Sequence, residues 1–229
     1  MGSSPCSSVD RAPASGAGCE RSSRSRGVVG KLGDRAGKMA QLFEIRWHGR
    51  GGQGAVTSAE MIALAAISEG KYAQSFPSFG PERRGAPVLA FNRIGDEPVR
   101  VRSAIDKPDV VVVLDPGLLR IINVASGLKE DGTLIINTNR KLDDIKSEFA
   151  FKYRLGTINA TKIAREVLGV PIVNTTMLGA LLKATDVVAL DSLSEPLKHR
   201  FGRLADRNIE ACMRAYEQVV IEEYRSGQG

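Results

Sequence analysis

The sequence is short of the residues that hold metals and redox clusters. Its 229 residues include three cysteines and two histidines, His48 and His199. An iron–sulfur cluster takes about four cysteine thiolates, so this chain cannot hold one by itself, and two histidines so far apart do not indicate a zinc site. We therefore predict that the chain binds no metal. The cysteines form no disulfide framework, which is typical of cytoplasmic proteins, the compartment we expect.

Aromatic residues and charge of one sign are also scarce. Aromatic residues make up 5% of the chain and are not interleaved with blocks of like charge, which excludes a stacking surface for single-stranded nucleic acid. The net charge is +6, but residues 1–38 hold seven Lys and Arg against three Asp and Glu, which leaves only about +2 on the rest. No run of about 18 apolar residues is present. We expect neither nucleic acid nor a membrane as a partner.

Residues 1–38 differ in composition from the rest of the chain. They are rich in Ser, Gly and Arg, contain no aromatic residue and have no helix or strand periodicity, so we expect them to be disordered. They lack the continuous apolar stretch of roughly 7 to 15 residues of a signal peptide, and their acidic residues disfavour a mitochondrial transit peptide. We expect Met39 to be the native start and residues 39–229 to form a single domain.

The rest of the chain alternates between β-branched runs and runs with helical spacing. A run such as "VVVV" is typical of a strand buried on both faces. Two runs around a turn at 95–98 predict a β-hairpin over 87–103. Strands are predicted at 41–47, 71–76, 108–115 and 132–138, and helices at 54–70, 117–128, 160–169, 176–188, 191–202 and 204–225. The order predicts an α/β fold: a mixed, mostly parallel, Rossmann-like sheet with flanking helices, one β-hairpin insertion and a helical C-terminus.

Four glycines stand within six positions between the first strand and the first helix: Gly49, Gly51, Gly52 and Gly54. Their spacing satisfies the dinucleotide fingerprint, in which glycines let backbone N–H groups and a helix N-terminus face a phosphate. The fingerprint also requires an acid about 20 residues on, where this chain reads "KYAQSF". The nicotinamide interpretation is therefore disfavoured, whereas a phosphate cradle and a tight turn without a ligand both stay open.

The stretch "QSFPSFGPERRGAP", residues 74–87, is a second candidate for a site. It contains Arg83 and Arg84 in a segment with no regular period. Arginine suits bidentate contacts with phosphate or carboxylate, although an isolated charged loop is more often only solvated. Open α/β sheets bind ligands at the carboxyl edge of their strands, and this edge carries the glycines.

Other polar residues are weaker candidates. His48 stands beside Trp47, where a structural role is the more common one. Asn174, Thr175 and Thr176 precede a helical run and predict a helix N-cap first and a ligand contact second. Asp115 ends a buried strand, yet Asp-Pro-Gly is also typical of a turn.

Several motifs give the chain a resemblance to a known family. It resembles the gamma subunits of the 2-oxoacid:ferredoxin oxidoreductases, most closely their pyruvate branch. The residues that carry this resemblance are "FEIRWHGRGGQGA", "FPSFGPERRGAP", "AFNRIGDEPVRVRS" followed by "PDVVVVLD", and "PIVNTTMLGAL". Gly85-Ala86 and the "RWHGR" opening are similar to the pyruvate or ketoisovalerate type, which favours pyruvate and leaves 2-ketoisovalerate open.

The resemblance implies a division of labour within an enzyme of anaerobic metabolism. The alpha and beta subunits would hold thiamine diphosphate with Mg, and the beta and delta subunits [4Fe-4S] clusters, with ferredoxin as electron acceptor. The gamma subunit would pack near the active site without being catalytic alone. It implies either coenzyme A binding or mainly subunit contacts for Gly49, Gly51, Gly52, Gln53, Gly54, Arg83, Arg84, Asn174 and Thr175. A stand-alone Rossmann-type nucleotide-binding protein is the alternative.

Overall fold

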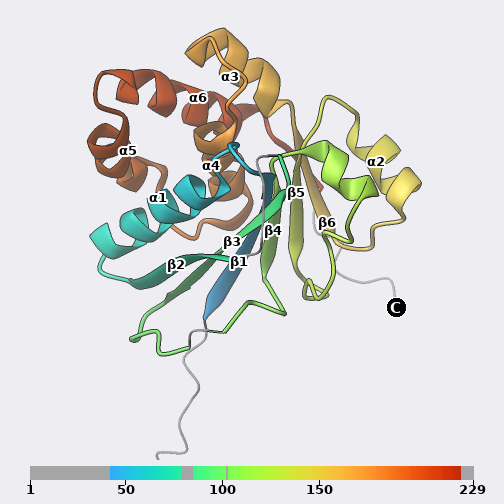
Figure 1. Ribbon diagram of the computed structural model, residues 1–229, viewed down its shortest axis with the longest axis horizontal. Helices are drawn as coiled ribbons and strands as arrows, with labels where there is room; N and C mark the ends of the chain where they lie inside the picture. Colours follow the sequence, from blue (N-terminus) through green and yellow to red (C-terminus); the bar gives the residue numbers. More distant parts are fainter. Residues whose placement is uncertain (1–41, 79–84, 102, 223–229) are drawn as a thin grey trace, which may run out of the picture. The chain divides into compact units, whose positions relative to one another are not determined.

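A seven-stranded mixed sheet forms the centre of the protein (Figure 1). The computed structural model describes residues 42–78, 85–101 and 103–222. The expectations for residues 1–38 and for Arg83 and Arg84 lie outside this range. The strands are β1 (Phe43–Arg50), β2 (Tyr72–Ser78), β3 (Pro87–Gly95), β4 (Val110–Val113), β5 (Thr133–Asn137), β6 (Arg154–Ile158) and β7 (Val220–Ile221).

The central strands run parallel and the outer ones antiparallel. The order across the sheet is β2-β3-β1-β4-β5-β6-β7. Strands β1, β4, β5 and β6 are parallel neighbours, whereas β3 pairs antiparallel with both β1 and β2, and β7 antiparallel with β6. The predicted α/β class with a mixed sheet and a helical C-terminal part is confirmed.

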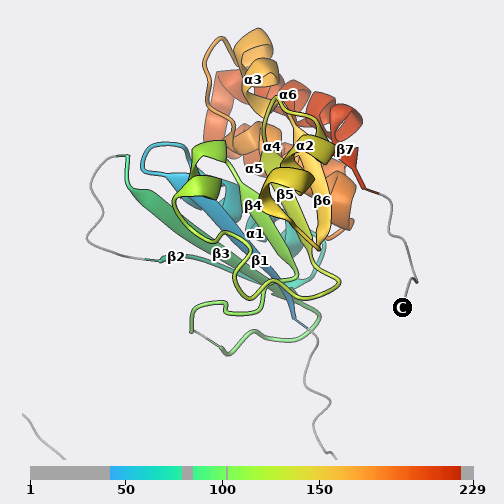
Figure 2. The same cartoon turned by 90° about the vertical axis from the view of Figure 1, so that its right-hand side faces the viewer.

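Helices cover both faces of the sheet (Figures 1 and 2). The larger core joins one face to helices from along the whole chain, and the smaller core joins the other face to a short 3-10 turn and one helix. On the first side lie α1 (Ala55–Ser68), α3 (Ala160–Leu168), α4 (Asn174–Thr185), α5 (Ser194–Phe201) and α6 (Ala205–Gln218), and on the second lie η1 (Pro116–Arg120) and α2 (Leu142–Phe149).

Strand β4 shows why its sequence is apolar throughout. Val110 and Val112 pack into the larger core, and Val111 and Val113 pack into the smaller one. Because successive side chains of a strand point to opposite faces, a strand with helices on both sides needs an apolar residue at every position. The prediction of a doubly buried strand is confirmed here.

The predicted hairpin over 87–103 is wrong in its second half. Strand β3 ends at Gly95, and the described residues that follow, 96–101, are not in a strand. Both edges of β3 are already paired, with β1 and with β2, so no edge is free for a further strand. The segment instead crosses over Arg93, whose guanidinium donates to the carbonyls of Val101 and Ala104.

The predicted helix over 117–128 is also wrong. Only η1 forms there, and turns follow it. Two contacts hold this chain path. The guanidinium of Arg46 donates to the carbonyls of Val124 and Ser126. Gly127 has a φ of +72°, and a Cβ on it would lie 2.0 Å from the carbonyl oxygen of Asp106, so the two loops pack backbone against backbone.

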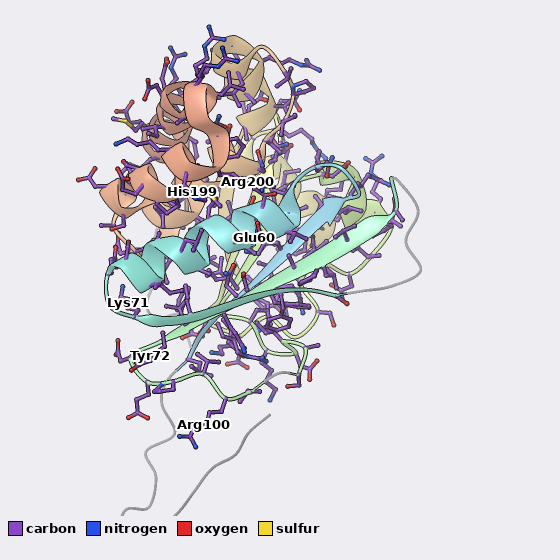
Figure 3. All side chains as sticks on the ribbon, turned by 60° about the vertical axis from the view of Figure 1, so that its left-hand side comes forward. Glu60, Lys71, Tyr72, Arg100, His199 and Arg200 are labelled. Atoms are coloured by element: carbon purple, nitrogen blue, oxygen red, sulfur yellow. The ribbon has the colours of Figure 1, made fainter. Side chains whose placement is uncertain are left out.

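Two elements were missed, and the last predicted helix was too long. Helix α2 and strand β6 lie between the predicted elements, and α6 ends at Gln218, before the short strand β7. Helix α1 runs from the carboxyl edge of β1 to the far end of the sheet, where Lys71 leads into β2 at Tyr72 (Figure 3).

Candidate functional site

Polar residues gather at the carboxyl edge of the parallel strands. Strand β1 ends at Arg50, β4 is followed by Asp115, β5 ends at Asn137, and Asn159 follows β6. Helix α1 begins at the same edge, directly after β1. Open α/β sheets bind ligands in this position, so the predicted site would lie at this edge.

The glycine turn, residues 49–54, needs its glycines for different reasons. A Cβ on Gly49 would lie 3.2 Å from Leu114 Cδ1 and 3.3 Å from Ala55 Cβ, and one on Gly54 would lie 2.7 Å from Asn174 Nδ2. No atom of the described residues lies within 4 Å of a Cβ placed on Gly52, but its φ is +96°, and the φ of Gly54 is +81°. Tight packing favours glycine at 49, left-handed backbone favours it at 52, and both favour it at 54.

In this turn the amides of Arg50, Gly51 and Gln53 donate to acceptors inside the protein. The N–H of Gly51 donates to the carbonyl of Ala86 at 3.0 Å, and that of Gln53 to the carbonyl of Arg50 at 3.0 Å. For the N–H groups of Gly52 and Gly54, the described part of the chain supplies no acceptor. Gly54 is the N-cap of α1 and no side chain caps this helix. The positive end of the α1 dipole therefore coincides with two N–H groups, those of Gly52 and Gly54, that have no acceptor among the described residues; we call them the open amides.

The carboxylate of Asp115 holds the glycine turn through hydrogen bonds. Its Oδ2 accepts from Arg50 Nε at 2.9 Å and from Gln53 Nε2 at 3.0 Å, and its Oδ1 accepts from Gly117 N at 2.8 Å. Gln53 Oε1 in turn accepts from Arg50 N at 2.7 Å. The side chain of Gln53, a predicted ligand residue, is thus occupied within the protein. Arg50 was missed by the sequence analysis, although its place among the glycines was a usable signal.

The start of β3 forms the other side of this edge. Arg50 pairs with Pro87 in the sheet, and its guanidinium donates to the carbonyl of Gly85 at 3.2 Å. Together with the bond from Gly51 to Ala86, this contact ties the glycine turn to Gly85–Ala86. The predicted site residues Arg83 and Arg84 directly precede this anchored pair in the sequence.

The start of α4 is divided between two environments. The helix begins at Asn174, after Val173 as N-cap, and has no side-chain cap, so the predicted N-cap role of Asn174, Thr175 and Thr176 is wrong. Asn174 packs against Gly54, and its carbonyl accepts from Ser58 Oγ at 3.1 Å. Thr175 is 1% exposed and donates to Asn208 Oδ1 at 2.7 Å. The structure therefore brings Asn174 to the glycine turn but directs Thr175 toward α6.

His48 is buried, as the structural interpretation predicts, but only one of its two ring nitrogens has a partner: its Nδ1 is buried and has none among the described residues. It is 4% exposed, and its Nε2 accepts from Arg46 Nε at 3.1 Å. Burial, aided by the nearby charge of Arg46, lowers the pKa of His48 to about 3. The ring is therefore neutral at physiological pH and lies on the face of β1 opposite Trp47, which faces α1.

The described residues contain no cluster of three His, Cys, Asp or Glu side chains that could hold a metal ion. Cys212 is buried, and burial raises the pKa of its thiol to about 12, which disfavours the thiolate that metals bind. None of the helices in 42–78, 85–101 and 103–222 is long and apolar enough to cross a membrane.

Comparison with known proteins identifies the family. The model of the pyruvate ferredoxin/flavodoxin oxidoreductase family matches residues 44–218. The chain belongs to this family. The common gamma subunit of the pyruvate/ketoisovalerate oxidoreductases of Thermococcus litoralis is 50% identical over 184 residues, covering 80% of this chain and 100% of the relative. Pyruvate synthase subunit PorC of Methanothermobacter marburgensis is 54% identical over 179 residues, covering 78% and 98%.

A solved structure agrees with these relatives. The pyruvate oxidoreductase subunit PORC of Thermotoga maritima is 42% identical to this chain and superposes with a TM-score of 0.72, covering 80% of this chain and 99% of that one. The resemblance drawn from the sequence motifs is thereby confirmed, and the α/β fold of this family member matches that of its structural neighbour.

Proposed function

We propose that this chain is the gamma subunit of a multi-subunit pyruvate:ferredoxin oxidoreductase. The complex would convert pyruvate, coenzyme A and two oxidised ferredoxins to acetyl-CoA, CO2, two reduced ferredoxins and one proton, in the cytoplasm. The observation that supports this most is the 54% identity to a pyruvate synthase subunit over 98% of that subunit's length. Identity at this level over a whole chain supports the same role in the same kind of assembly.

The other subunits would carry the redox chemistry. This chain has three cysteines, fewer than the four or so thiolates of a [4Fe-4S] cluster, so we assign the clusters and thiamine diphosphate with Mg to alpha, beta and delta subunits. Thiamine diphosphate would supply the carbon that attacks the oxo group, and ferredoxin would accept the electrons. The contribution of the gamma chain would be binding and orientation, not catalysis on its own.

We further propose that the glycine turn and the segment after β2 contact coenzyme A, which carries several phosphates. The open amides of Gly52 and Gly54 at the start of α1 suit an anionic oxygen. Asn174 adds a polar side chain beside Gly54, and Arg83 and Arg84 would supply charge. Gly49 would permit the close packing of the turn, and Gly51 and Gln53 would shape it through their internal bonds. Thr175, which faces α6, would act only through the position of Asn174.

The sheet order disfavours the alternative of a stand-alone Rossmann-type nucleotide-binding protein. In that fold a parallel strand beside β1 ends in the acid that binds the ribose. Here β1 lies between antiparallel β3, which begins at this edge with Pro87, and parallel β4. The carboxylate that follows β4, Asp115, is bonded to Arg50, Gln53 and Gly117, so among the described residues neither neighbour of β1 ends in a carboxylate without protein partners. We therefore favour the subunit role.

Purification of the tagged chain from its own host under anaerobic conditions tests the subunit role. We expect co-purification of partner chains, iron and thiamine diphosphate, and coenzyme A-dependent reduction of a viologen dye with pyruvate. Faster reduction with 2-ketoisovalerate would reassign the substrate, since the Thermococcus litoralis relative is common to both oxidoreductases. A chain recovered alone, without iron and without activity, would contradict the proposal.

The double variant R83A/R84A tests the coenzyme A contact. In the intact complex we expect its KM for coenzyme A to rise about tenfold or more, because each lost charged hydrogen bond weakens binding by roughly 1.5–3 kcal/mol. The control R200A/R203A removes the same charge from exposed positions around the end of α5 (Figure 3 labels Arg200) and should leave this KM unchanged. An unaltered KM in R83A/R84A, with the complex intact, would rule out this role.

A further inference from the structure

The carboxylate of Asp115 has three donors that come from two segments of the chain. Arg50 and Gln53 belong to the glycine turn, 65 and 62 residues before Asp115, whereas Gly117 lies in η1, 2 residues after it. The Asp115 side chain is 20% exposed and that of Arg50 is 30% exposed. At such partial burial an ion pair adds little stability by itself, so the arrangement is better explained by the geometry it imposes than by its energy.

Only a carboxylate satisfies all three donors. Both oxygens of Asp115 accept, Oδ1 from Gly117 N and Oδ2 from Arg50 Nε and Gln53 Nε2. An asparagine here has one acceptor oxygen, and its NH2 group would face an N–H in either orientation. D115N therefore breaks one side of the arrangement while it preserves the size of the side chain.

The backbone of Leu114, directly before Asp115, is hydrogen-bonded to two neighbouring strands. Leu114 N donates to His48 O at 2.8 Å, and Leu114 O accepts from Asn137 Nδ2 at 2.9 Å. The Leu114 side chain fills the space that a Cβ on Gly49 would enter. The backbone next to Asp115 is thus anchored to β1 and β5, independently of the bonds that its side chain makes to the turn.

The same arrangement reaches the start of β3. Arg50, held by Asp115 through Nε, donates from its terminal nitrogen to Gly85 O at 3.2 Å, and Gly51 N donates to Ala86 O. The glycine turn and residues 85–86 are therefore held at a fixed separation. These are the two sides of the site proposed above to contact coenzyme A.

We propose that Asp115 is a positioning residue for coenzyme A: it holds Arg50 and Gln53 so that the open amides of the glycine turn stay in register with the start of β3. This inference rests on the proposed function. Asp115 would act through Arg50 and Gln53 and not by contact with the ligand, because a carboxylate repels phosphate and three of its roughly four acceptor sites already hold protein donors. Its loss should affect the coenzyme A step and leave the pyruvate step alone.

Kinetics of D115N in the intact complex test this inference. We expect KM for coenzyme A to rise about tenfold, which corresponds to about 1.4 kcal/mol of binding free energy, because the glycine turn is no longer held against residues 85–86. KM for pyruvate and kcat should change less than about twofold. The matched control is D109N. Asp109 also accepts from a backbone amide, Glu44 N, and from a cation, Lys129, but directly before β4, at the opposite edge of the sheet. Its loss should leave the coenzyme A KM unchanged.

A second variant covers the case in which D115N does not assemble. R50K keeps a positive charge beside Asp115 but loses the fork that joins Asp115 to Gly85, and it should raise the same KM. If D115N and R50K both leave the coenzyme A KM within twofold, or if D109N raises it equally, the positioning role is wrong. If R83A/R84A raises that KM and D115N does not, only this inference fails; if R83A/R84A also has no effect, the proposed coenzyme A contact fails with it.

Discussion

Replacement of Gly54 by alanine should destabilise the protein more than the same change at Gly52. Both glycines have left-handed backbone, with φ of +81° and +96°, so both replacements carry a backbone penalty of roughly 1–2 kcal/mol. Among the described residues, only the Cβ on Gly54 would meet another group, 2.7 Å from Asn174 Nδ2 and 3.0 Å from its Cβ. Overpacking of this kind adds about 1–3 kcal/mol, so the predicted loss is about 2–5 kcal/mol for G54A against 1–2 for G52A.

Urea unfolding of the purified chain measures this difference. Trp47 is the only tryptophan, it is 0% exposed, and it lies two residues before Gly49, so its fluorescence reports on the region around the turn. With a slope of about 2 kcal/mol per molar urea, the midpoint of G54A should lie roughly 0.5–1.5 M below that of G52A. The double variant G54A/N174A removes Nδ2 and should recover part of the loss. Equal midpoints for G54A and G52A would show that α4 yields to the turn and would refute the packing argument.

Two further predictions concern buried groups. Burial lowers the folded-state pKa of His48 from 6.5 to about 3, so between these pH values the unfolded state binds one more proton than the folded state. The free energy of unfolding should therefore be at its full value above pH 6.5 and fall as the pH drops below it, by at most about 1.4 kcal/mol per pH unit. In H48Q, urea midpoints measured from pH 7 to 4.5 should fall less steeply with decreasing pH, and an unchanged slope would contradict the assignment. In G179A a Cβ would lie 1.9 Å from Cys212 O, so α4 and α6 must separate and thermal unfolding should occur at a temperature lower by roughly 6 °C or more; a shift below 2 °C would show that the two backbones do not pack this closely.

The sequence was most informative where one local cause decides the structure. The unbroken valines of β4 had to be buried on both faces, and the glycines between β1 and α1 had to mark a tight turn. The helix expected over 117–128 failed because its apolar residues, such as Val124 and Leu128, are buried by a looped path. That path depends on Arg46 and on the contact between Gly127 and Asp106, which are distant in sequence. Periodicity cannot distinguish a helix from a loop held in this way.

The composition of the site was only partly predictable for the same reason. Gln53 has a side chain that could hydrogen-bond a ligand, yet this side chain is hydrogen-bonded to Arg50 and Asp115. The Arg50–Asp115 pair spans 65 residues, and no local pattern couples two such positions. The partner of Gly54 was equally hidden, because Asn174 reaches it from a helix that begins 120 residues after it along the chain. The sequence motifs predicted which edge of the sheet holds these residues, whereas the contacts between them could be identified only from the three-dimensional structure.

The position of β3 explains how a dinucleotide-like spacing of glycines can serve a different ligand. In a Rossmann fold the strand beside β1 ends at the ligand edge and delivers an acid to the ribose. Here β3 is antiparallel and begins at that edge, so it delivers backbone carbonyls, those of Gly85 and Ala86, which bond to Arg50 and Gly51. The Gly51 amide, from which a dinucleotide phosphate would accept in a Rossmann fold, therefore donates to the protein itself. The amides of Gly52 and Gly54 remain available at the start of α1. A site built in this way favours an anionic group at the helix terminus, and the carboxylate described at this edge, that of Asp115, is bonded to protein donors. This is consistent with a phosphate-bearing cosubstrate and disfavours a nicotinamide dinucleotide.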